Sequence, residues 1–145
     1  MADILTFVAV LASGLFAGAA VYITVVEHPA RLSCGTEVAA RQWAPSYKRA
    51  TVMQASLAIV AAVSGSARWF QTHDRLWLMG GLAILAVVPF TLLVIYPTNH
   101  RLLQPGRDLA SEETRQLLES WGRLHAVRSG LGLAAVVLFI EAAIG

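Results

Sequence analysis

The stretch that decides the fold is Ile4–Val26, "ILTFVAVLASGLFAGAAVYITVV", which runs directly into "EHPAR" at residues 27–31. It contains no charged side chain. A bilayer core about 30 Å thick is crossed by roughly 20 apolar helical residues, so this stretch predicts a membrane-spanning helix. It also exceeds the roughly 7–15 apolar residues of a signal peptide and has no basic segment before it, so we interpret it as an uncleaved span.

Three further apolar segments repeat this pattern. The whole chain is 57% hydrophobic and 14% charged, whereas soluble domains are about 25% charged. The expected spans are about 4–26, 50–67, 76–96 and 126–144, within a single domain that covers residues 1–145. Because backbone groups in lipid must bond within their own segment, the sequence predicts an all-α bundle of four membrane helices. Pro89 is expected to kink the third helix, and Gly80 predicts close packing there.

The basic side chains predict how the spans are oriented. Of the 11 Lys and Arg residues, only Arg68 and Arg75 lie between the second and third spans, and all the others follow the first or third span. Positive residues favour the cytoplasmic side of a membrane. We therefore expect a multi-pass membrane protein with its first and third loops in the cytoplasm and both termini on the opposite side.

The third loop is expected to contain a helix of its own. Ser111 can cap a helix whose first turn holds Glu112 and Glu113, and these acidic residues suit the positive end of the helix dipole. Apolar residues then recur at three- and four-residue spacing through residue 128. The sequence predicts an amphipathic connecting helix that continues into the fourth span.

Polar side chains gather at the same end of all four spans. They are Tyr22, Thr24, Glu27 and His28 after the first span, Tyr47, Lys48, Arg49 and Gln54 at the second, Thr91, Tyr96, Thr98, Asn99 and His100 at the third, and Trp121, His125 and Arg128 at the fourth. Ionisable residues at membrane depth usually face the bundle interior or a water-filled cavity. Trp121, His125 and Arg128 also share one helix face by their spacing. This convergence predicts a site.

Each of these residues also has a plainer interpretation. Glu27 and His28 could decorate a helix end that Pro29 stops, and His125 and Arg128 could form a pair that reaches toward the membrane interface. Trp43 is interpreted as an interface anchor, with a pocket wall as the alternative. Gln54 is harder to explain in this way, because one turn into a span its amide needs a hydrogen-bonding partner.

No cofactor is expected, although a bound metal remains an alternative. Glu27, His28, His100 and His125 are acceptable ligand types for iron, copper or zinc, but no two of them stand at ligand spacing on one helix. The net charge of +2 gives no reason to expect a nucleic-acid partner. The expected partners are a small apolar molecule and membrane lipid, and a homo-oligomer is left open.

Four blocks of the sequence together resemble a known family. They are "GLFAGAAVYITVVEHPAR", "QWAPSYKRATVMQ", "PFTLLVIYPTNHRLL" and "WGRLHAVRSGL", which occur in this order from Gly14 to Leu131. In combination they resemble the anthrone oxygenase-like family of small membrane proteins. The resemblance implies a four-helix membrane protein, and some fungal members oxidise polyketide anthrones to anthraquinones with dioxygen. His100 departs from the family pattern, which more often has Lys or Arg at this position, so His100 is not expected to be a general base.

The resemblance also implies roles for the polar cluster. An anthrone methylene is acidic enough for a side chain to deprotonate, and the resulting carbanion can pass an electron to dioxygen without a cofactor. We expect His125 to be the base, oriented by Glu27 or Asn99, with His28 as the alternative base. Arg128 would stabilise the phenolate as charge develops. The expected substrate-binding residues are Tyr22, Gln54, Tyr96 and Trp121.

Two functions are expected alternatives. The resemblance implies the first, a membrane-bound monooxygenase of secondary metabolism that oxidises an anthrone, or a similar apolar aromatic, to a quinone with dioxygen. The second is a non-enzymatic small membrane protein that binds a lipid or hydrophobic metabolite, or that acts as a subunit of a larger complex.

Overall fold

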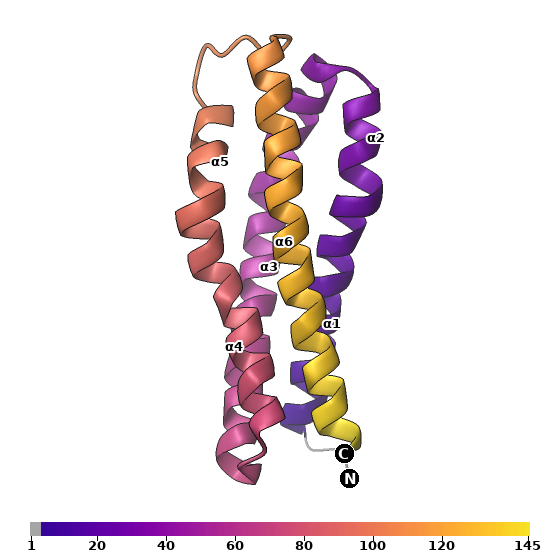
Figure 1. Ribbon diagram of the computed structural model, residues 1–145, viewed down its shortest axis with the longest axis vertical. Helices are drawn as coiled ribbons and strands as arrows, with labels where there is room; N and C mark the ends of the chain where they lie inside the picture. Colours follow the sequence, from indigo (N-terminus) through magenta and orange to yellow (C-terminus); the bar gives the residue numbers. More distant parts are fainter. Residues whose placement is uncertain (1–3) are drawn as a thin grey trace.

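The computed structural model describes residues 4–145, and Figure 1 shows them as four long helical segments. The first segment consists of α1 (Ile4–Tyr22), η1 (Ile23–Glu27) and α2 (His28–Ser33), and the second is α3 (Thr36–Thr72). The third consists of α4 (Arg75–Phe90), η2 (Thr91–Ile95) and α5 (Tyr96–Leu102), and the fourth is α6 (Glu112–Ile144). Residues 4–145 contain no strand, so the predicted all-α fold is confirmed.

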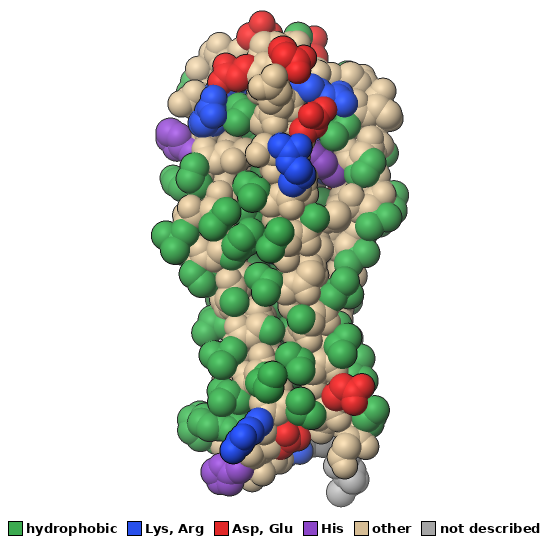
Figure 2. Space-filling model, in the orientation of Figure 1, with side chains coloured by type: hydrophobic (Ala, Val, Ile, Leu, Met, Phe, Trp, Pro, Cys, Tyr) green, Lys and Arg blue, Asp and Glu red, His purple; other side chains and the backbone are tan. Residues whose placement is uncertain are grey.

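The four segments pack as an antiparallel bundle. α1 contacts α3 and α6, and α4 contacts the same two helices from the opposite side. All four segments are long and apolar enough to cross a membrane. Figure 2 shows hydrophobic side chains over the middle of the molecule and charged side chains at its two ends. These features are those of a multi-pass membrane protein.

The first and third segments both continue past a proline, although Pro29 was a possible end of the first helix and the expected third span ended at residue 96. Pro29 does not stop the first segment, because η1 is a π-helical turn in which the His28 N–H bonds to the Ile23 carbonyl oxygen. The third segment has the same kind of π-helical turn in η2, where the Tyr96 N–H bonds to the Thr91 carbonyl oxygen before Pro97. The wider π turn relieves the clash of the proline ring with the preceding turn, although Pro45 and Pro89 lie within the α-helices α3 and α4. Figure 1 shows the third segment bending where α4 passes into α5.

The half of the bundle that contains Ile4 and Gly145, here called the terminal half, is closely packed. Phe139 is fully buried, and its ring stacks on Trp77 at a centroid distance of 5.6 Å. A Cβ atom added at Gly65 or Gly80 would lie 2.5 or 2.6 Å from that ring. Only glycine fits at these two positions, so the predicted close packing at Gly80 is confirmed.

The connecting helix also forms as predicted. The Ser111 hydroxyl caps α6 by accepting a hydrogen bond from the Thr114 N–H at 3.2 Å, and Glu112 and Glu113 occupy the first turn. α6 then runs without interruption to Ile144. It therefore carries Trp121, His125 and Arg128 from the connecting region into the bundle.

Candidate functional site: a buried polar cavity

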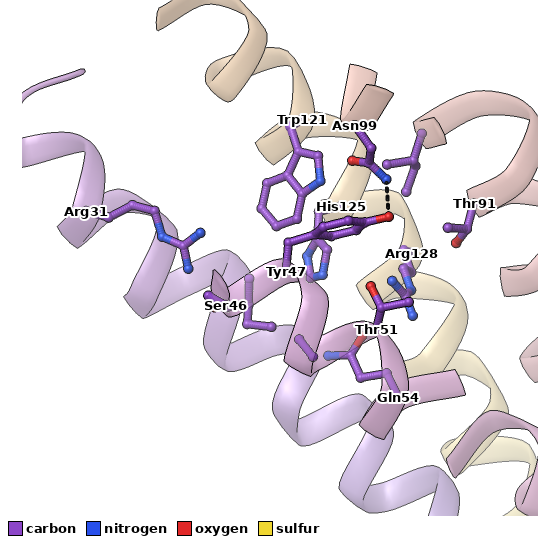
Figure 3. Close-up of a pocket in the computed structure, with 13 residues that line it drawn as sticks. Arg31, Ser46, Tyr47, Thr51, Gln54, Thr91, Asn99, Trp121, His125 and Arg128 are labelled. Carbon is purple, nitrogen blue, oxygen red and sulfur yellow. Dashed lines mark hydrogen bonds between the residues drawn. The ribbon is translucent and has the colours of Figure 1, made fainter. Parts of the chain in front are cut away.

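A small polar cavity lies in the other half of the bundle, which we call the site half. Its volume is about 20 Å³, which is room for roughly one water molecule. The side chains that surround it come from all four segments (Figure 3): Ile23, Arg31, Ser46, Tyr47, Ala50, Thr51, Gln54, Thr91, Ile95, Asn99, Trp121, His125 and Arg128. The predicted convergence of polar side chains from four helices is therefore present in the structure.

Several polar atoms around this cavity are buried and have no hydrogen-bond partner within residues 4–145. They are Gln54 Nε2, Thr91 Oγ1, Asn99 Oδ1, Trp121 Nε1 and Arg128 Nε. Leaving a buried polar group unpaired costs about 1–3 kcal/mol. Because buried polar groups in folded proteins are usually paired, these atoms are available to bond to a water molecule or to polar atoms of a ligand in the cavity.

Two buried arginines at this cavity have different surroundings. Arg31 forms an ion pair with Glu27 at 2.7 Å, and Glu27 also accepts hydrogen bonds from Gln42 and Ser46. Arg128 is 8% exposed and pairs with no carboxylate among residues 4–145. Its guanidinium instead lies 5.4 Å from the centre of the Phe16 ring. Because a buried charge is costly unless it is paired, Arg128 is prepared to bind an anion.

A chain of hydrogen bonds fixes the tautomer of His125. The Ser129 hydroxyl shares its single proton between the backbone carbonyl oxygens of Ala20 and His125, so it accepts from the Thr24 hydroxyl at 2.8 Å. The Thr24 oxygen must then accept from the His125 Nδ1–H at 3.0 Å. This assignment leaves the lone pair of the neutral ring on Nε2, which bonds to no group within residues 4–145. A neutral imidazole with a free Nε2 at a cavity can act as a base.

Aromatic rings hold the His125 side chain on its other side. Trp121 stacks on His125 at a centroid distance of 4.7 Å, and Trp43 meets Trp121 edge-on at 5.7 Å. Tyr47 stacks on Trp43 at 4.9 Å and accepts a hydrogen bond from the Asn99 amide at 3.1 Å. Trp43 is 1% exposed, so the interpretation of Trp43 as an interface anchor is wrong, and this ring supports the site.

The predicted site residues divide into three groups. Gln54, Asn99, Trp121, His125 and Arg128 line the cavity. Tyr22 and Glu27 line a separate outer groove between the first segment and α3. His28 and Tyr96 line neither. The buried His28 ring bonds through Nε2 to the Leu118 carbonyl oxygen at 2.9 Å, and Tyr96 is 52% exposed beside His100.

One predicted contact is replaced by another. Neither Glu27 nor Asn99 bonds to His125, because Glu27 is engaged by Arg31 and Asn99 by Tyr47. Thr24 performs that role instead. The cavity also includes Tyr47 and Thr91, which belong to the predicted polar cluster but were given no individual role, and Thr51, which was not part of that predicted cluster. The Thr51 hydroxyl inside an apolar helix was the available signal, but hydroxyls are common in membrane helices.

A protein metal site needs several ligating side chains close together. Within residues 4–145, no three His, Cys, Asp or Glu side chains are grouped closely enough to hold a metal ion together. Of the four proposed ligand types, His125 lines the cavity, whereas Glu27, His28 and His100 do not.

Fold and site together define a class of protein: a small four-helix membrane protein with a buried polar cavity that contains an oriented imidazole and an unpaired guanidinium. The chain belongs to the anthrone oxygenase family, whose sequence model matches residues 43–138. This range includes six of the predicted site residues, Gln54, Tyr96, Asn99, Trp121, His125 and Arg128. The resemblance seen in the sequence is therefore confirmed.

Individual relatives support the same assignment. The chain is 32% identical to an anthrone oxygenase of Claviceps purpurea, over 90% of this chain and 84% of the relative. It is 29% identical to the anthrone oxygenase tpcL of Aspergillus fumigatus, over 90% of this chain and 87% of the relative. The anthrone oxygenase ptaC of Pestalotiopsis fici is 32% identical over 70% of this chain and 82% of the relative. No solved structure matches the chain.

Proposed function

We propose that this protein is a membrane-bound monooxygenase that oxidises the methylene group of an anthrone, or of a similar apolar aromatic, to a carbonyl with dioxygen. The observation that carries the proposal is the pairing of the free His125 Nε2 with the unpaired Arg128 guanidinium at one buried cavity. A base and a cation side by side suit a substrate that loses a proton and becomes an anion. The names of the relatives support the same chemistry.

In the proposed reaction, His125 Nε2 removes one methylene proton while Arg128 stabilises the negative charge on the conjugated ring oxygen. The carbanion transfers an electron to dioxygen, and the resulting radical pair combines to a peroxide anion that is protonated by the His125 imidazolium. Loss of the second methylene proton and cleavage of the O–O bond give the carbonyl and water. One oxygen atom enters the product, and the substrate supplies all four electrons, so the reaction requires no bound metal or flavin.

The neighbouring side chains would orient the substrate. Gln54 and Trp121 each present an unpaired N–H at the cavity, and Asn99 presents an unpaired carbonyl oxygen. These groups can bond to ring hydroxyls and carbonyls of a polyhydroxylated aromatic. An anthrone of this kind belongs to secondary metabolism, which we propose as the setting.

We further propose that the site half faces the cytoplasm. The basic residues other than Arg68 and Arg75 lie in α2, the first part of α3, α5, the loop after α5 and α6 up to Arg128, and these parts belong to this half. Membrane proteins keep such an excess of Lys and Arg on the cytoplasmic side. The chain termini would then lie on the opposite side of the membrane.

The origin of the product oxygen tests the proposed reaction. The detergent-purified protein is mixed with a hydroxylated anthrone under ¹⁸O₂, and the product is analysed by mass spectrometry against the spontaneous background. We expect one labelled oxygen in the new carbonyl and one dioxygen consumed per quinone formed. Conversion no faster than background, by folded protein, would instead favour a non-enzymatic protein that binds hydrophobic molecules.

A further inference from the structure

An apolar groove leads from the lipid-facing surface to the polar cavity. It lies between α3 and the α4–η2 part of the third segment and has a volume of about 140 Å³. Its floor is formed by Ala58 and Val87, which are 3% and 2% exposed. Ala55, Val88 and Leu92 line its exposed outer side. We call it the α3/α4 groove.

The inner end of the α3/α4 groove is polar. Thr51, Thr91 and Arg128 line both this groove and the cavity, so the two spaces meet at these three side chains. Arg128 is the charged residue among those that line the groove, and it has no protein carboxylate beside it. A molecule in the groove would therefore have an apolar body and a negative or strongly polar oxygen at its inner end.

A second groove, between the first segment and α3, fits such a molecule less well. It is larger, about 580 Å³, and meets the cavity at Ile23, Ser46 and Ala50. Glu27 on this side is bonded to Arg31 and also accepts from Ser46. Arg49 lines this groove without an ion-pair partner among residues 4–145, but it is exposed, whereas Arg128 is 8% exposed. A cation that solvent can reach binds an anionic oxygen more weakly than a buried one.

The position of the α3/α4 groove along the length of the bundle also suits a ligand that arrives from lipid. Arg128 lies about 24 Å along α6 from its end at Ile144, at about 1.5 Å per residue. A hydrocarbon core about 30 Å thick that begins near that end includes Arg128 and the groove beneath it. An apolar molecule dissolved in the bilayer could reach the groove without crossing water.

We propose that the α3/α4 groove binds the aromatic rings of the substrate and admits them sideways from the bilayer, with Arg128 binding the acidic ring oxygen. This inference rests on the proposed function and adds the route and the binding surface. Groove and cavity together are smaller than the roughly 300–1,000 Å³ of typical small-molecule sites. The reactive edge of the substrate therefore lies where the groove meets the cavity, at Thr51, Thr91 and Arg128, while the outer ring extends past Val88 and Leu92 to the lipid.

Photolabelling tests the location of the rings without requiring turnover. An anthraquinone, the product of the proposed reaction, abstracts hydrogen from nearby C–H groups when irradiated and couples to them. With the purified full-length protein, we expect labelled peptides that include Ala55, Val88 or Leu92. Labelling concentrated at Tyr22 and Met53, which line the other groove, would overturn the groove assignment and leave the proposed oxidation intact.

Two matched variants extend the test. Ala55→Phe fills the α3/α4 groove at an exposed position and should reduce both labelling there and kcat/KM for the anthrone at least 10-fold. Ala19→Phe makes the same change in the other groove and should leave both within about 2-fold. Equal losses in the two variants would contradict the proposal. Loss of labelling when an equimolar fatty acid is added would also contradict it, because the groove would then bind acyl chains.

The two proposals fail in distinguishable ways. Labelling in the α3/α4 groove that is lost in Ala55→Phe, from a protein without anthrone oxidation, would support the binding surface and reject the oxygenase. Anthrone oxidation that is unaffected by Ala55→Phe would support the oxygenase and reject the groove.

Discussion

The buried residues of the two halves of the bundle differ in chemistry. In the terminal half, Phe139 fills the space that Gly65 and Gly80 provide, and the core is apolar. In the site half, buried side chains such as Gln54 and Arg128 are polar, and several of their atoms have no protein partner. The site half also has a buried apolar cluster, which includes Trp43 and Leu118, but its unpaired polar atoms lower its contribution to stability, whereas the terminal half combines an apolar core with close packing. This division teaches where mutations should affect folding and where they should affect chemistry.

The largest expected effect on stability comes from the terminal half. Phe139→Ala removes a ring that contacts Trp77 and leaves a cavity between α3, α4 and α6. Substitutions of this kind cost about 3–5 kcal/mol. The free energy of unfolding in mixed micelles measures the effect, and the specific activity of the remaining folded protein should stay within about 2-fold. A large loss of specific activity in folded protein would contradict the separation of folding effects and chemical effects between the two halves.

Arg128→Met should produce the opposite pattern. Removing the guanidinium takes away the proposed stabilisation of the substrate anion, and losses of about 10²- to 10³-fold in kcat are typical for such groups. The unfolding temperature should stay the same or rise, because an unpaired buried charge is replaced by an apolar side chain. Arg31→Met is the comparison, and it should lower the unfolding temperature because Glu27 loses its ion-pair partner. If Arg128→Met destabilises as much as Arg31→Met, Arg128 has a structural role.

A smaller effect is expected at the glycines beside Phe139. Gly80→Ala places a Cβ about 2.6 Å from the Phe139 ring, and overpacking of this kind costs about 1–3 kcal/mol. Gly18→Ala serves as the control, since a Cβ there has no neighbour within 4 Å. The unfolding temperatures of both variants test whether the terminal half is closely packed. Equal unfolding temperatures for the two variants would contradict that picture.

The smallest effect is expected at Thr24. Thr24→Val removes the acceptor for His125 Nδ1–H without changing the size of the side chain, and losing one hydrogen bond of about 1–1.5 kcal/mol lowers kcat roughly 10-fold. Thr24→Ser retains the hydroxyl and should restore most of the rate. Failure of the serine variant to restore activity would show that the methyl group, and therefore packing, is what matters at Thr24.

The sequence was sufficient for the fold and for half of the site. Four apolar segments predicted the bundle because membrane spans are defined by length and hydrophobicity, which need no tertiary information. The spacing of Trp121, His125 and Arg128 placed them correctly on one face of α6. The helix ends were not predicted, because the sequence does not indicate that π turns before Pro29 and Pro97 allow the helices to continue.

The remaining errors concern contacts between different helices. Thr24 bonds to His125, which lies 101 positions away, and this contact depends on how α6 and the first segment are rotated about their axes. The same rotations place Tyr22 and Glu27 in an outer groove and leave Tyr96 exposed. Rotation about a helix axis is set by packing across the whole bundle, so a local pattern of polar residues does not predict it.

The initial rate of oxygen uptake with a hydroxylated anthrone tests the central claim most directly, when wild-type protein is compared with His125→Ala and His100→Ala in the same detergent. Both variants lose an imidazole, but only His125 lines the cavity. The account predicts a wild-type rate well above the spontaneous background, a decrease of about 10²- to 10⁴-fold for His125→Ala, and little change for His100→Ala. A folded His125→Ala protein that consumes oxygen as fast as the wild type would contradict it.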